Sequence, residues 1–422
     1  MSAPTTPGVT LEAITDAREA IRPFIRETPA WSSALLEQAT GVSVWLKCEQ
    51  MQRTGSFKIR GATNFVRLLS AAESAKGLVA SSAGNHAQGV ALAATTLGID
   101  AVVVMPTFAP LAKISGAREY GARVVLHGSS LEEARTEAMA IAAREGRLYV
   151  PPFDSDAVIA GQGTIGLEIL EQVPDVAEII VPAGGGGLLA GIAVAARSIR
   201  PEVRIIGVQA AHMDGIVRSF ARGEVVTTAP SRTIADGVAV AGPSARTFAL
   251  IERHVADVVS VSDEAIAHAM VLLLERAKMV VEGAGALGVA ALYGGAYRPK
   301  GPTVVVLSGG NIDINLVGSI VRRGLVDAGR YRQLSIEVSD TPGELALVSR
   351  AIADAGGNII EVDHNREAPG MPVGIAVLQL LLEVNGPDHF DEIIRVLRER
   401  GLRGVVGSPA RLATEDARRH HD

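Results

Sequence analysis

The sequence predicts an α/β protein with a parallel sheet, followed by a smaller unit with the element order βαββαβ. Two observations predict the sheet. Short apolar runs alternate with helical patterns from about residue 77 onward, and the 422-residue chain contains 45 glycines but only 4% aromatic residues. Buried parallel strands joined by helices through tight turns favour such a composition. The third observation is a change of pattern after about residue 325, which predicts the smaller unit.

The large first part of the chain contains alternating elements. An amphipathic helix is expected over 11–26, where Pro23 can end it early, and a strand over 42–46. The next elements in order are helix 57–69, strand 77–81, helix 85–97, strand 101–105, a helix after Pro110, strand 123–126 and helix 131–144. A second series contains strand 178–182, helix 188–199, strand 204–209 and a late strand at 303–307. Such alternation indicates βαβ units.

The end of the chain predicts a ferredoxin-like unit. Its expected elements are strand 332–338, helix 343–355, strands 358–365 and 373–383, helix 388–400 and strand 404–407. We therefore expect a large domain over 1–325 with a smaller lobe at roughly 50–155. A linker at 326–331, a small domain at 332–410 and a polar tail at 411–422 would follow.

Composition and charge exclude several classes of function. The net charge is −6 without a basic block, so neither nucleic acid nor an anionic membrane is an expected partner. No apolar run is long enough to span a bilayer, and the N-terminus lacks a signal-peptide pattern. The single Cys48 suits a reducing compartment. These features together predict a cytoplasmic protein.

Lys58 is the first candidate for chemistry. It follows Gly55-Ser56-Phe57 at the start of a predicted helix. A lysine whose pKa is lowered by burial becomes a nucleophile and can hold a carbonyl cofactor as a Schiff base. Taken alone, the segment favours an ordinary helix lysine. Three further glycine-rich segments favour the reactive one.

The glycine run Gly184–Gly187 follows strand 178–182 directly and opens a helix. Without Cβ atoms, successive backbone N–H groups can converge on an anion, and the helix N-terminus adds a favourable field. The run is not a G-x-G-x-x-G fingerprint, and no P-loop lysine follows it. It therefore predicts a phosphate without a nucleotide, with a tight packing turn as the alternative.

Two other junctions offer polar groups. The segment 82–86, Ser-Ala-Gly-Asn-His, joins a strand to a helix and could hold a carboxylate, or simply cap the helix. The segment 308–311, Ser-Gly-Gly-Asn, follows the strand at 303–307, and ligands of open parallel sheets bind at that edge. A glycine-rich turn is its alternative reading.

The remaining ionisable residues give weaker signals. Glu282 could bring a carboxylate near the same cleft, although helix capping or a surface salt bridge is its expected role. His212, His254 and His364 lack metal-ligand spacing, so no metal site is expected.

Together, Lys58 within Thr54–Ala62, Ser82–His86, the glycine run and Ser308–Asn311 resemble the fold-type II pyridoxal-phosphate enzymes, whose fold is like that of the tryptophan synthase β chain. The most similar family is that of the threonine dehydratases (threonine ammonia-lyases). The resemblance covers about residues 10–325. Asp340–Leu345 and Gly356–Ile359 resemble an ACT domain, which binds small effectors, usually amino acids, at paired interfaces.

The resemblance implies a role for each matched residue. Lys58 would hold pyridoxal 5'-phosphate and act as the base, Phe57 would pack by the cofactor ring, and Asn85 would bond its phenolic oxygen. The cofactor phosphate would lie on the backbone of Gly184, Gly185, Gly186, Gly187 and Leu188, and the pyridine nitrogen on Ser308. The substrate carboxylate would lie on Ser82, Gly84, Asn85 and His86. An effector would contact Pro342, Gly343, Asn358 and Ile359.

The implied activity is the β-elimination of L-threonine to 2-oxobutanoate and ammonia, and of L-serine to pyruvate. Feedback by an amino acid such as isoleucine and a homotetramer or homodimer are also implied, in isoleucine biosynthesis or threonine catabolism. A serine at 308 cannot keep the pyridine nitrogen protonated as a carboxylate would, which favours elimination over transamination.

Two positions depart from the related serine racemases. Ala83 stands where those enzymes have a second catalytic serine, so racemisation should be weak. Gln209 replaces their carboxylate ligand for a divalent ion, which puts such an ion in doubt. The alternative functions are a serine racemase/dehydratase or β-replacement synthase of the same fold, or a catalytically inactive ACT amino-acid sensor.

Overall fold

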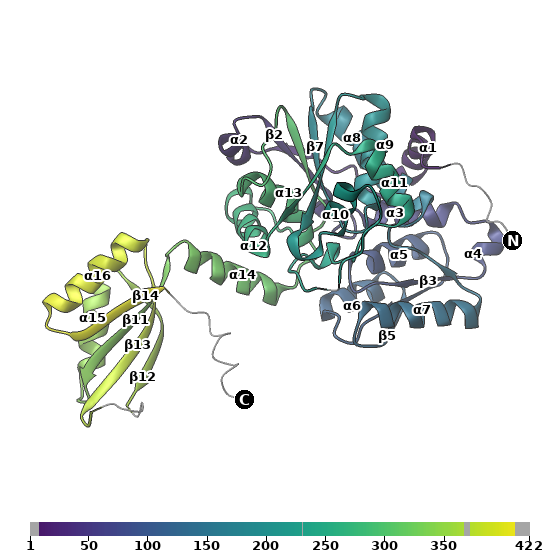
Figure 1. Ribbon diagram of the computed structural model, residues 1–422. Coiled ribbons are helices and arrows are strands. Elements are labelled where there is room, and N and C mark those ends of the chain that lie inside the picture. The colour runs from purple at the N-terminus through teal and green to yellow at the C-terminus, as the bar shows by residue number, and fades with distance from the viewer. Residues whose placement is uncertain (1–7, 230, 367–371, 410–422) are drawn as a thin grey trace. The chain divides into compact units, whose positions relative to one another are not determined.

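The computed structural model describes residues 8–229, 231–366 and 372–409, and the chain divides into two compact units, 1–313 and 314–422 (Figure 1). The sequence-based boundary at 325 falls inside helix α14 (Ile314–Asp327), which belongs to the second unit. The segment expected as a polar tail, 411–422, lies outside the described residues.

The larger sheet of the first unit has the strand order β1-β2-β10-β7-β8-β9. Its strands are β1 (Ala30–Ser32), β2 (Val44–Cys48), β7 (Glu178–Pro182), β8 (Arg204–Ala210), β9 (Asp257–Val261) and β10 (Thr303–Leu307). All neighbouring pairs are parallel except β1 with β2. The predicted parallel sheet is therefore confirmed, with one antiparallel strand at its edge.

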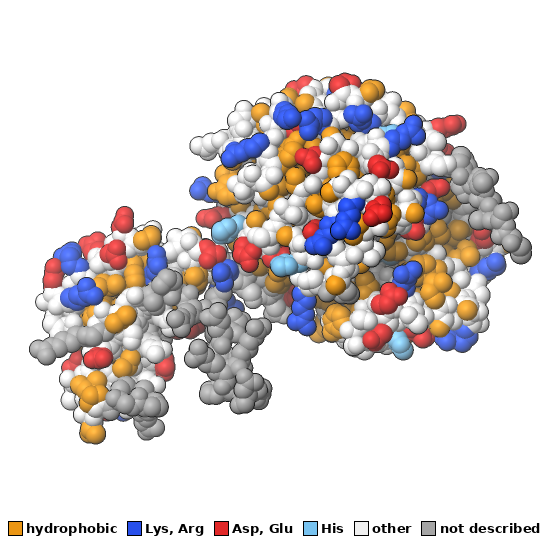
Figure 2. Space-filling view, viewed as in Figure 1, with side chains coloured by type: hydrophobic (Ala, Val, Ile, Leu, Met, Phe, Trp, Pro, Cys, Tyr) orange, Lys and Arg blue, Asp and Glu red, His pale blue; other side chains and the backbone are white. Residues whose placement is uncertain are grey.

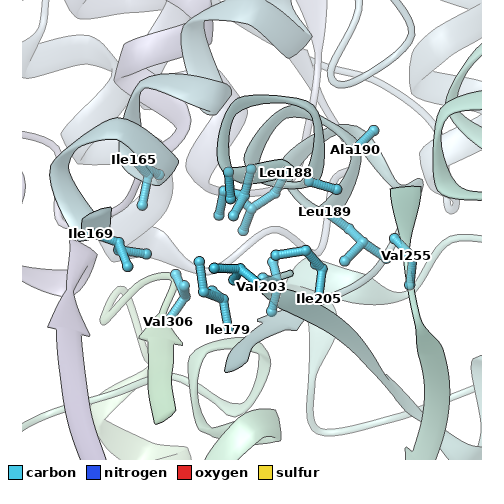
Figure 3. Packing of buried hydrophobic residues seen from close by; sticks show 14 of the residues in the cluster. Ile165, Ile169, Ile179, Leu188, Leu189, Ala190, Val203, Ile205, Val255 and Val306 are labelled. Carbon is cyan, nitrogen blue, oxygen red and sulfur yellow. The ribbon is translucent and has the colours of Figure 1, made fainter. Parts of the chain in front are cut away.

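Helices cover both faces of this sheet. They are α1 (Leu11–Ile21), α2 (Ala34–Thr40), α8 (Asp156–Gln172), α9 (Gly187–Ile199), α10 (Gly215–Arg222), α11 (Ala245–His254), α12 (Asp263–Leu272) and α13 (Gly283–Tyr293). On one face, the apolar side chains of α8 and α9 meet those of the strands in a continuous core (Figure 3). On the other face, Gly288 lets α13 approach the sheet closely, since a Cβ there would lie 2.5 Å from Val305 Cγ1.

The smaller sheet is entirely parallel and has the order β5-β4-β3-β6. Its strands are β3 (Leu78–Ser81), β4 (Ala101–Met105), β5 (Arg123–Leu126) and β6 (Leu148–Tyr149). The helices around it are α3 (Lys58–Arg67), α4 (Ala71–Ser74), α5 (Asn85–Thr96), α6 (Leu111–Glu119) and α7 (Leu131–Glu145). Side chains of α3, α5 and α6 share a core on one face, and α7 packs on the other. We call this sheet and its helices the smaller lobe, and the rest of the first unit the larger lobe.

The second unit has the predicted βαββαβ order. It contains β11 (Tyr331–Ser339), α15 (Glu344–Asp354), β12 (Asn358–Asn365), β13 (Ile375–Glu383), α16 (Pro387–Glu399) and β14 (Arg403–Pro409). The four strands form an antiparallel sheet, β12-β13-β11-β14. Alternate residues of β11 and β13 are buried against α15 and α16, which explains the period of two in the sequence.

The visible face of the molecule shows acidic and basic side chains interspersed with apolar ones (Figure 2). In the part of the chain that the structure describes, no helix has the length and apolar character needed to cross a bilayer.

Candidate active site

A cavity of about 890 Å³ lies in the first unit, where both lobes contribute side chains and loops. The carboxyl ends of β3, β7 and β10 open onto it, which is where parallel sheets bind ligands. Every residue that the sequence assigned to cofactor or substrate lines this cavity: Phe57, Lys58, Ser82, Gly84, Asn85, His86, Gly184, Gly185, Gly186, Gly187, Leu188 and Ser308.

Lys58 is the first residue of α3, and its Nζ donates to the carbonyl oxygen of Pro152 at 2.9 Å. The same Nζ lies 5.2 Å from the centre of the Phe57 ring. Burial lowers the pKa of Lys58 to about 8, although the charge of Glu282 opposes the shift. About a tenth of this amine is therefore uncharged at pH 7, far more than for an exposed lysine, and the uncharged form is what a nucleophile or base requires.

The glycine turn is built so that no side chain could occupy it. A Cβ on Gly185 would lie 2.5 Å from the Phe153 ring, and one on Gly187 would lie 3.0 Å from the Phe153 backbone. Gly186 has φ +91° and is the N-cap of α9. The turn therefore presents backbone N–H groups and a helix N-terminus to the cavity, the arrangement that binds a phosphate.

Asn85 begins α5 and is held from two sides. Its Oδ1 accepts a hydrogen bond from Asn311 Nδ2 at 2.8 Å, and its Nδ2 donates to Glu282 Oε1 at 2.6 Å. An amide nitrogen carries two hydrogens, so one Nδ2–H remains for a ligand oxygen. Its neighbours thus fix the amide in the orientation that makes Asn85 a donor to the cavity.

For Glu282 the sequence offered two interpretations, a carboxylate near the cleft and, as the expected role, a helix cap or a surface salt bridge. The structure supports the first, because the side chain is buried in the cavity wall and Oε2 has no hydrogen-bond partner among the described residues. Burial raises the pKa of Glu282 to about 7; the charge of Asp236 raises it further, and Lys113, Asn85 and Lys58 oppose the shift. Its bond to Asn85 spans 197 residues of sequence, so no local pattern could reveal it.

The segment 82–86 offers donors of different kinds. Ser82 Oγ accepts a bond from the Gly84 N–H at 3.1 Å and keeps its own hydroxyl hydrogen to donate. His86 is buried, and its Nε2 donates to the Val150 carbonyl at 2.9 Å. Burial, with the charge of Lys58, lowers the pKa of His86 to about 3, so the ring is neutral. Its backbone N–H, in the first turn of α5, remains to bind a carboxylate.

Ser308 follows β10 and connects the cavity to the lysine helix. Its carbonyl accepts a bond from the Phe57 N–H at 3.1 Å, and Ser56 pairs with Gly309 in an isolated bridge. The Gly310 N–H donates to the Gly55 carbonyl at 2.9 Å. These backbone bonds hold Ser308 and Lys58 in a fixed relation within one cavity.

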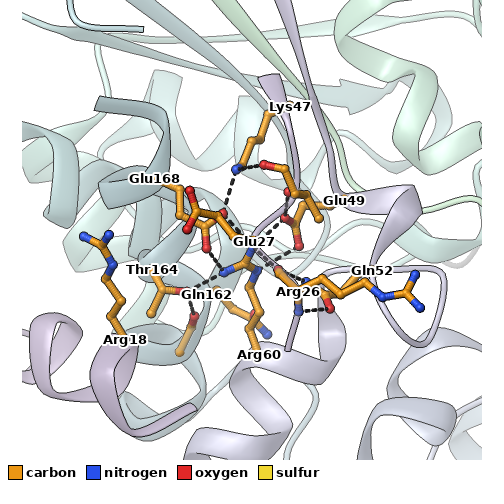
Figure 4. A network of polar contacts seen from close by, with 12 residues as sticks. Arg18, Arg26, Glu27, Lys47, Glu49, Gln52, Arg60, Gln162, Thr164 and Glu168 are labelled. Carbon is orange, nitrogen blue, oxygen red and sulfur yellow. Dashed lines mark hydrogen bonds and ion pairs between the residues drawn. The ribbon is translucent and has the colours of Figure 1, made fainter. Parts of the chain in front are cut away.

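A buried network of charges around Arg60, two residues after Lys58, anchors α3 (Figure 4). The Arg60 guanidinium forms ion pairs with Glu49 at 2.8 Å and Glu168 at 2.6 Å, and Lys47 forms another with Glu168 at 2.6 Å. Burial alone would lower the pKa of Arg60, but Glu49 and Glu168 outweigh it and the net shift is upward. Sequence analysis gave no sign of this network, because its members come from β2, α3, α8 and the residues following β2.

Five charged residues that the sequence did not single out also line the cavity: Lys113, Glu132, Arg135, Asp154 and Asp236. Two of them form an ion pair with each other. The Nζ of Lys113, in α6, donates to Oδ2 of Asp236. Asp236 begins a short 3₁₀ helix of the larger lobe, η4 (Asp236–Val238). This ion pair joins the two lobes at the cavity.

Gln209, placed by sequence at a possible divalent-ion site, lies at the end of β8. Its Oε1 accepts bonds from the N–H groups of Ile216 and Val217 at 2.8 and 2.9 Å. The oxygen thus caps α10. Within the described residues, no group of three or more His, Cys, Asp or Glu side chains could hold a metal ion.

The predicted effector residues all lie in the second unit. Pro342 and Gly343 are exposed before α15, and Gly343 has φ +103°. Asn358 begins β12, where its Nδ2 donates to Glu383 Oε2 at 3.3 Å, and the neighbouring Ile359 pairs with Leu382.

The cavity fits pyridoxal phosphate because it combines an amine that can react with an aldehyde and a backbone cradle that a phosphate would fill. A parallel two-lobed fold with such a site defines the class of fold-type II pyridoxal-phosphate enzymes. The chain belongs to the family described as pyridoxal-phosphate dependent enzyme, whose model matches residues 21–309.

Individual relatives show which members of this family the chain is similar to. The chain is 45% identical to the L-threonine ammonia-lyase of Thermotoga maritima over 393 residues, covering 93% of this chain and 98% of that relative. Among solved structures, the processed form of threonine deaminase isoform 2 from Solanum lycopersicum is 37% identical with a TM-score of 0.70, covering 74% of this chain and 92% of that one. Maize serine racemase is 35% identical with a TM-score of 0.72, covering 75% and 98%.

Proposed function

We propose that this protein is a pyridoxal-phosphate-dependent ammonia-lyase that converts L-threonine to 2-oxobutanoate and ammonia, and L-serine to pyruvate and ammonia. The observation that carries the proposal is that Lys58, the glycine turn and Ser308 line one cavity. Similarity to an L-threonine ammonia-lyase over 93% of the chain supports the choice of substrate.

Each cavity residue has one task in this proposal. The backbone of Gly184 to Leu188 binds the cofactor phosphate, the free Nδ2–H of Asn85 bonds its phenolic oxygen, and Phe57 packs beside its ring. When bound, pyridoxal phosphate supplies an electron sink that makes the Cα–H of the amino acid acidic. The uncharged Lys58 amine takes that proton, and the β-hydroxyl gains a proton and leaves as water. Hydrolysis of the released enamine then gives the 2-oxo acid and ammonia.

Ser308 sets the direction of the reaction. A neutral hydroxyl beside the pyridine nitrogen leaves that nitrogen largely unprotonated, whereas a carboxylate would keep it charged. The weaker electron sink favours rapid loss of the β-substituent over transamination. Ser82, with the backbone N–H groups at the start of α5, holds the substrate carboxylate.

Racemisation is a minor activity at most in this proposal. Ala83 lines the cavity where the related serine racemases have a second catalytic serine, and a methyl group cannot donate a proton. When L-serine is the substrate, product analysis should find much more pyruvate than D-serine.

The test is a steady-state assay of the purified, cofactor-loaded protein with L-threonine and L-serine. We expect 2-oxobutanoate from L-threonine and pyruvate from L-serine, each in an amount equal to that of the ammonia released. Turnover of neither substrate would refute the proposal. Product formation only when a sulfur nucleophile is added would indicate a β-replacement synthase instead.

We also propose that the second unit is an ACT-type regulatory domain acting in a homodimer or homotetramer. The exposed Gly343 turn at the N-terminus of α15 offers backbone N–H groups for an effector carboxylate, and Asn358 and Ile359 begin the next strand. An effector such as isoleucine changes activity only if it binds one arrangement of the subunits more tightly than another. The coupling free energy between effector and substrate binding should be roughly 1–3 kcal/mol.

Regulation can be tested separately from catalysis. Kinetics of the full chain should change with isoleucine or valine, while a chain ending after residue 328 should stay active and ignore both. If calorimetry detects no binding of isoleucine or valine and neither amino acid changes the kinetics, the regulatory role would be contradicted. Light scattering would establish the number of chains in the assembly.

A further inference from the structure

The ion pair of Lys113 and Asp236 has no part in the reaction as derived above. Its two members differ in exposure, since the Lys113 side chain is 7% exposed and that of Asp236 is 57% exposed. Both line the cavity, Lys113 from the smaller lobe and Asp236 from the larger. The ammonium is therefore nearly enclosed within the cavity wall, while its carboxylate partner remains accessible to water.

Lys113 also lies beside the segment that would hold the substrate carboxylate. A Cβ built on Gly84 would be 3.4 Å from Lys113 Nζ, with the Cδ and Cε atoms of the lysine at 3.7 and 3.8 Å. The lysine side chain thus runs along Gly84, which belongs to the segment Ser82–His86. An ammonium has three donors, and Asp236 Oδ2 engages one of them here.

We propose that Lys113 is a specificity-determining residue: its ammonium exchanges Asp236 for the α-carboxylate of the incoming amino acid. This inference rests on the proposed function, because it assumes a substrate carboxylate at Ser82–His86. Asp236 acts as a stand-in anion that neutralises the ammonium until the substrate replaces it. Since the carboxylate of Asp236 is partly solvated, water can take over its hydrogen bonds when Lys113 leaves.

The exchange predicts that removing Lys113 and removing Asp236 change the affinity for a ligand carboxylate in opposite directions. Removing Asp236 leaves a nearly enclosed ammonium without its carboxylate, so a ligand carboxylate should bind more tightly. Removing Lys113 deprives the ligand of its cation and leaves the negative charge of Asp236 nearby, so binding should weaken. A pair that only tied the lobes together would respond to both changes in the same direction.

The experiment compares the cofactor-loaded full chain with Lys113→Met and Asp236→Asn variants. The ligand is L-alanine, which has no β-hydroxyl to lose, and its binding is followed by calorimetry and by the visible spectrum of the cofactor. L-alaninol, which lacks the carboxylate, is the matched ligand. Arg123→Met, which removes the exposed pair with Glu145 in the same lobe, is the control variant.

We expect Lys113→Met to raise the Kd of L-alanine about tenfold or more, as for a lost charged hydrogen bond. Asp236→Asn should lower it by up to about fivefold, the scale of a partly exposed ion pair. The Kd of L-alaninol should change little in either variant, and Arg123→Met should match the wild type with both ligands.

Three results would overturn the proposal: an unchanged Kd of L-alanine in Lys113→Met, weaker binding of L-alanine in Asp236→Asn, or equal shifts for L-alanine and L-alaninol. Should a single variant fail to fold, the double variant Lys113→Met/Asp236→Asn keeps the test, because it must still bind L-alanine more weakly than wild type and L-alaninol equally well. Because these are binding measurements, a wild type that binds L-alanine but eliminates neither threonine nor serine would refute the proposed function alone.

Discussion

Two helix N-termini in this protein begin with a left-handed glycine, Gly186 before α9 and Gly343 before α15. The first borders the cavity but is otherwise closely packed, and Cβ atoms on the glycines at 184–187 would lie 2.5–3.0 Å from their nearest neighbours. The second is open, and a Cβ on Gly343 would meet nothing within 4 Å. The comparison teaches that the same local geometry becomes a rigid binding site only where surrounding elements hold it in place.

The largest expected effect comes from the packed side of the comparison. Lys58→Ala removes both the cofactor anchor and the base, so threonine turnover should fall at least about 10³-fold. Circular dichroism should show a folded protein, because the cavity wall tolerates the smaller side chain. The exposed Lys76→Ala is the matched control. Near-normal formation of 2-oxobutanoate by Lys58→Ala would show that the role of Lys58 is misassigned.

Gly185→Ala tests the packed turn directly. Its Cβ would lie 2.5 Å from the Phe153 ring, so the turn or the ring must shift, and overpacking of this kind costs about 1–3 kcal/mol. The Kd of pyridoxal phosphate, measured by fluorescence quenching, should rise about tenfold or more. An unchanged Kd would mean that the turn does not carry the phosphate.

Ser308→Asp changes the chemistry of the packed site without changing its backbone. A carboxylate would keep the pyridine nitrogen protonated and strengthen the electron sink, so elimination should slow by about tenfold or more and transaminated cofactor should appear. Rapid-scan spectra and product analysis would follow both. Ser308→Thr, which keeps a hydroxyl, is the control. Equal rates in Ser308→Asp and wild type would count against the serine's role.

Burial in the packed site also predicts a pH effect on stability. His86 has a pKa of about 3 in the folded state against 6.5 when exposed, so the unfolded chain binds more protons between these values. Its contribution is fully present above pH 6.5 and is lost as the pH falls, by about 1.4 kcal/mol per unit at most. The free energy of unfolding, measured with urea at several pH values between 6.5 and 5, should fall less steeply with decreasing pH for His86→Gln than for the wild type. Identical slopes would place the imidazole in solvent.

The smallest effect is expected at the open turn. Gly343→Ala meets no neighbour, so only its positive φ is unfavourable, by about 1 kcal/mol. Basal turnover of threonine should equal that of wild type, while the response to isoleucine should weaken. A large loss of basal activity would contradict the distinction between the packed and the open turn.

Sequence alone predicted much of this fold, because most strands have sharp boundaries. The strands at 101–105, 178–182 and 303–307 begin and end where the sequence placed them. Helices α8 and α13 were missed, since buried residues surround them and leave no amphipathic period. The glycines at 161, 163 and 166 of α8 look like helix breakers, yet they allow close approach of α3 and α9.

The candidate site was predictable where its residues lie at the ends of strands. Asn85, the glycine turn and Ser308 each follow a strand directly or after a short turn, and Lys58 begins a helix behind a glycine-rich turn; local sequence carries these signals. The bond of Glu282 to Asn85 and the ion pair of Lys113 with Asp236 were not predictable, because each joins residues more than 100 positions apart along the chain. Long-range pairing leaves no spacing pattern to read.

The buried network around Arg60 constrains how this sequence can diverge. Removing any one of Arg60, Glu49 or Glu168 leaves an uncompensated charge in the interior, at a cost of about 3–5 kcal/mol, whereas replacing the whole set by well-packed apolar residues can be neutral. A lineage changing one residue at a time must therefore cross variants that barely fold. Such a barrier would preserve the charges behind the lysine helix even if the cavity in front of it were to acquire a new substrate.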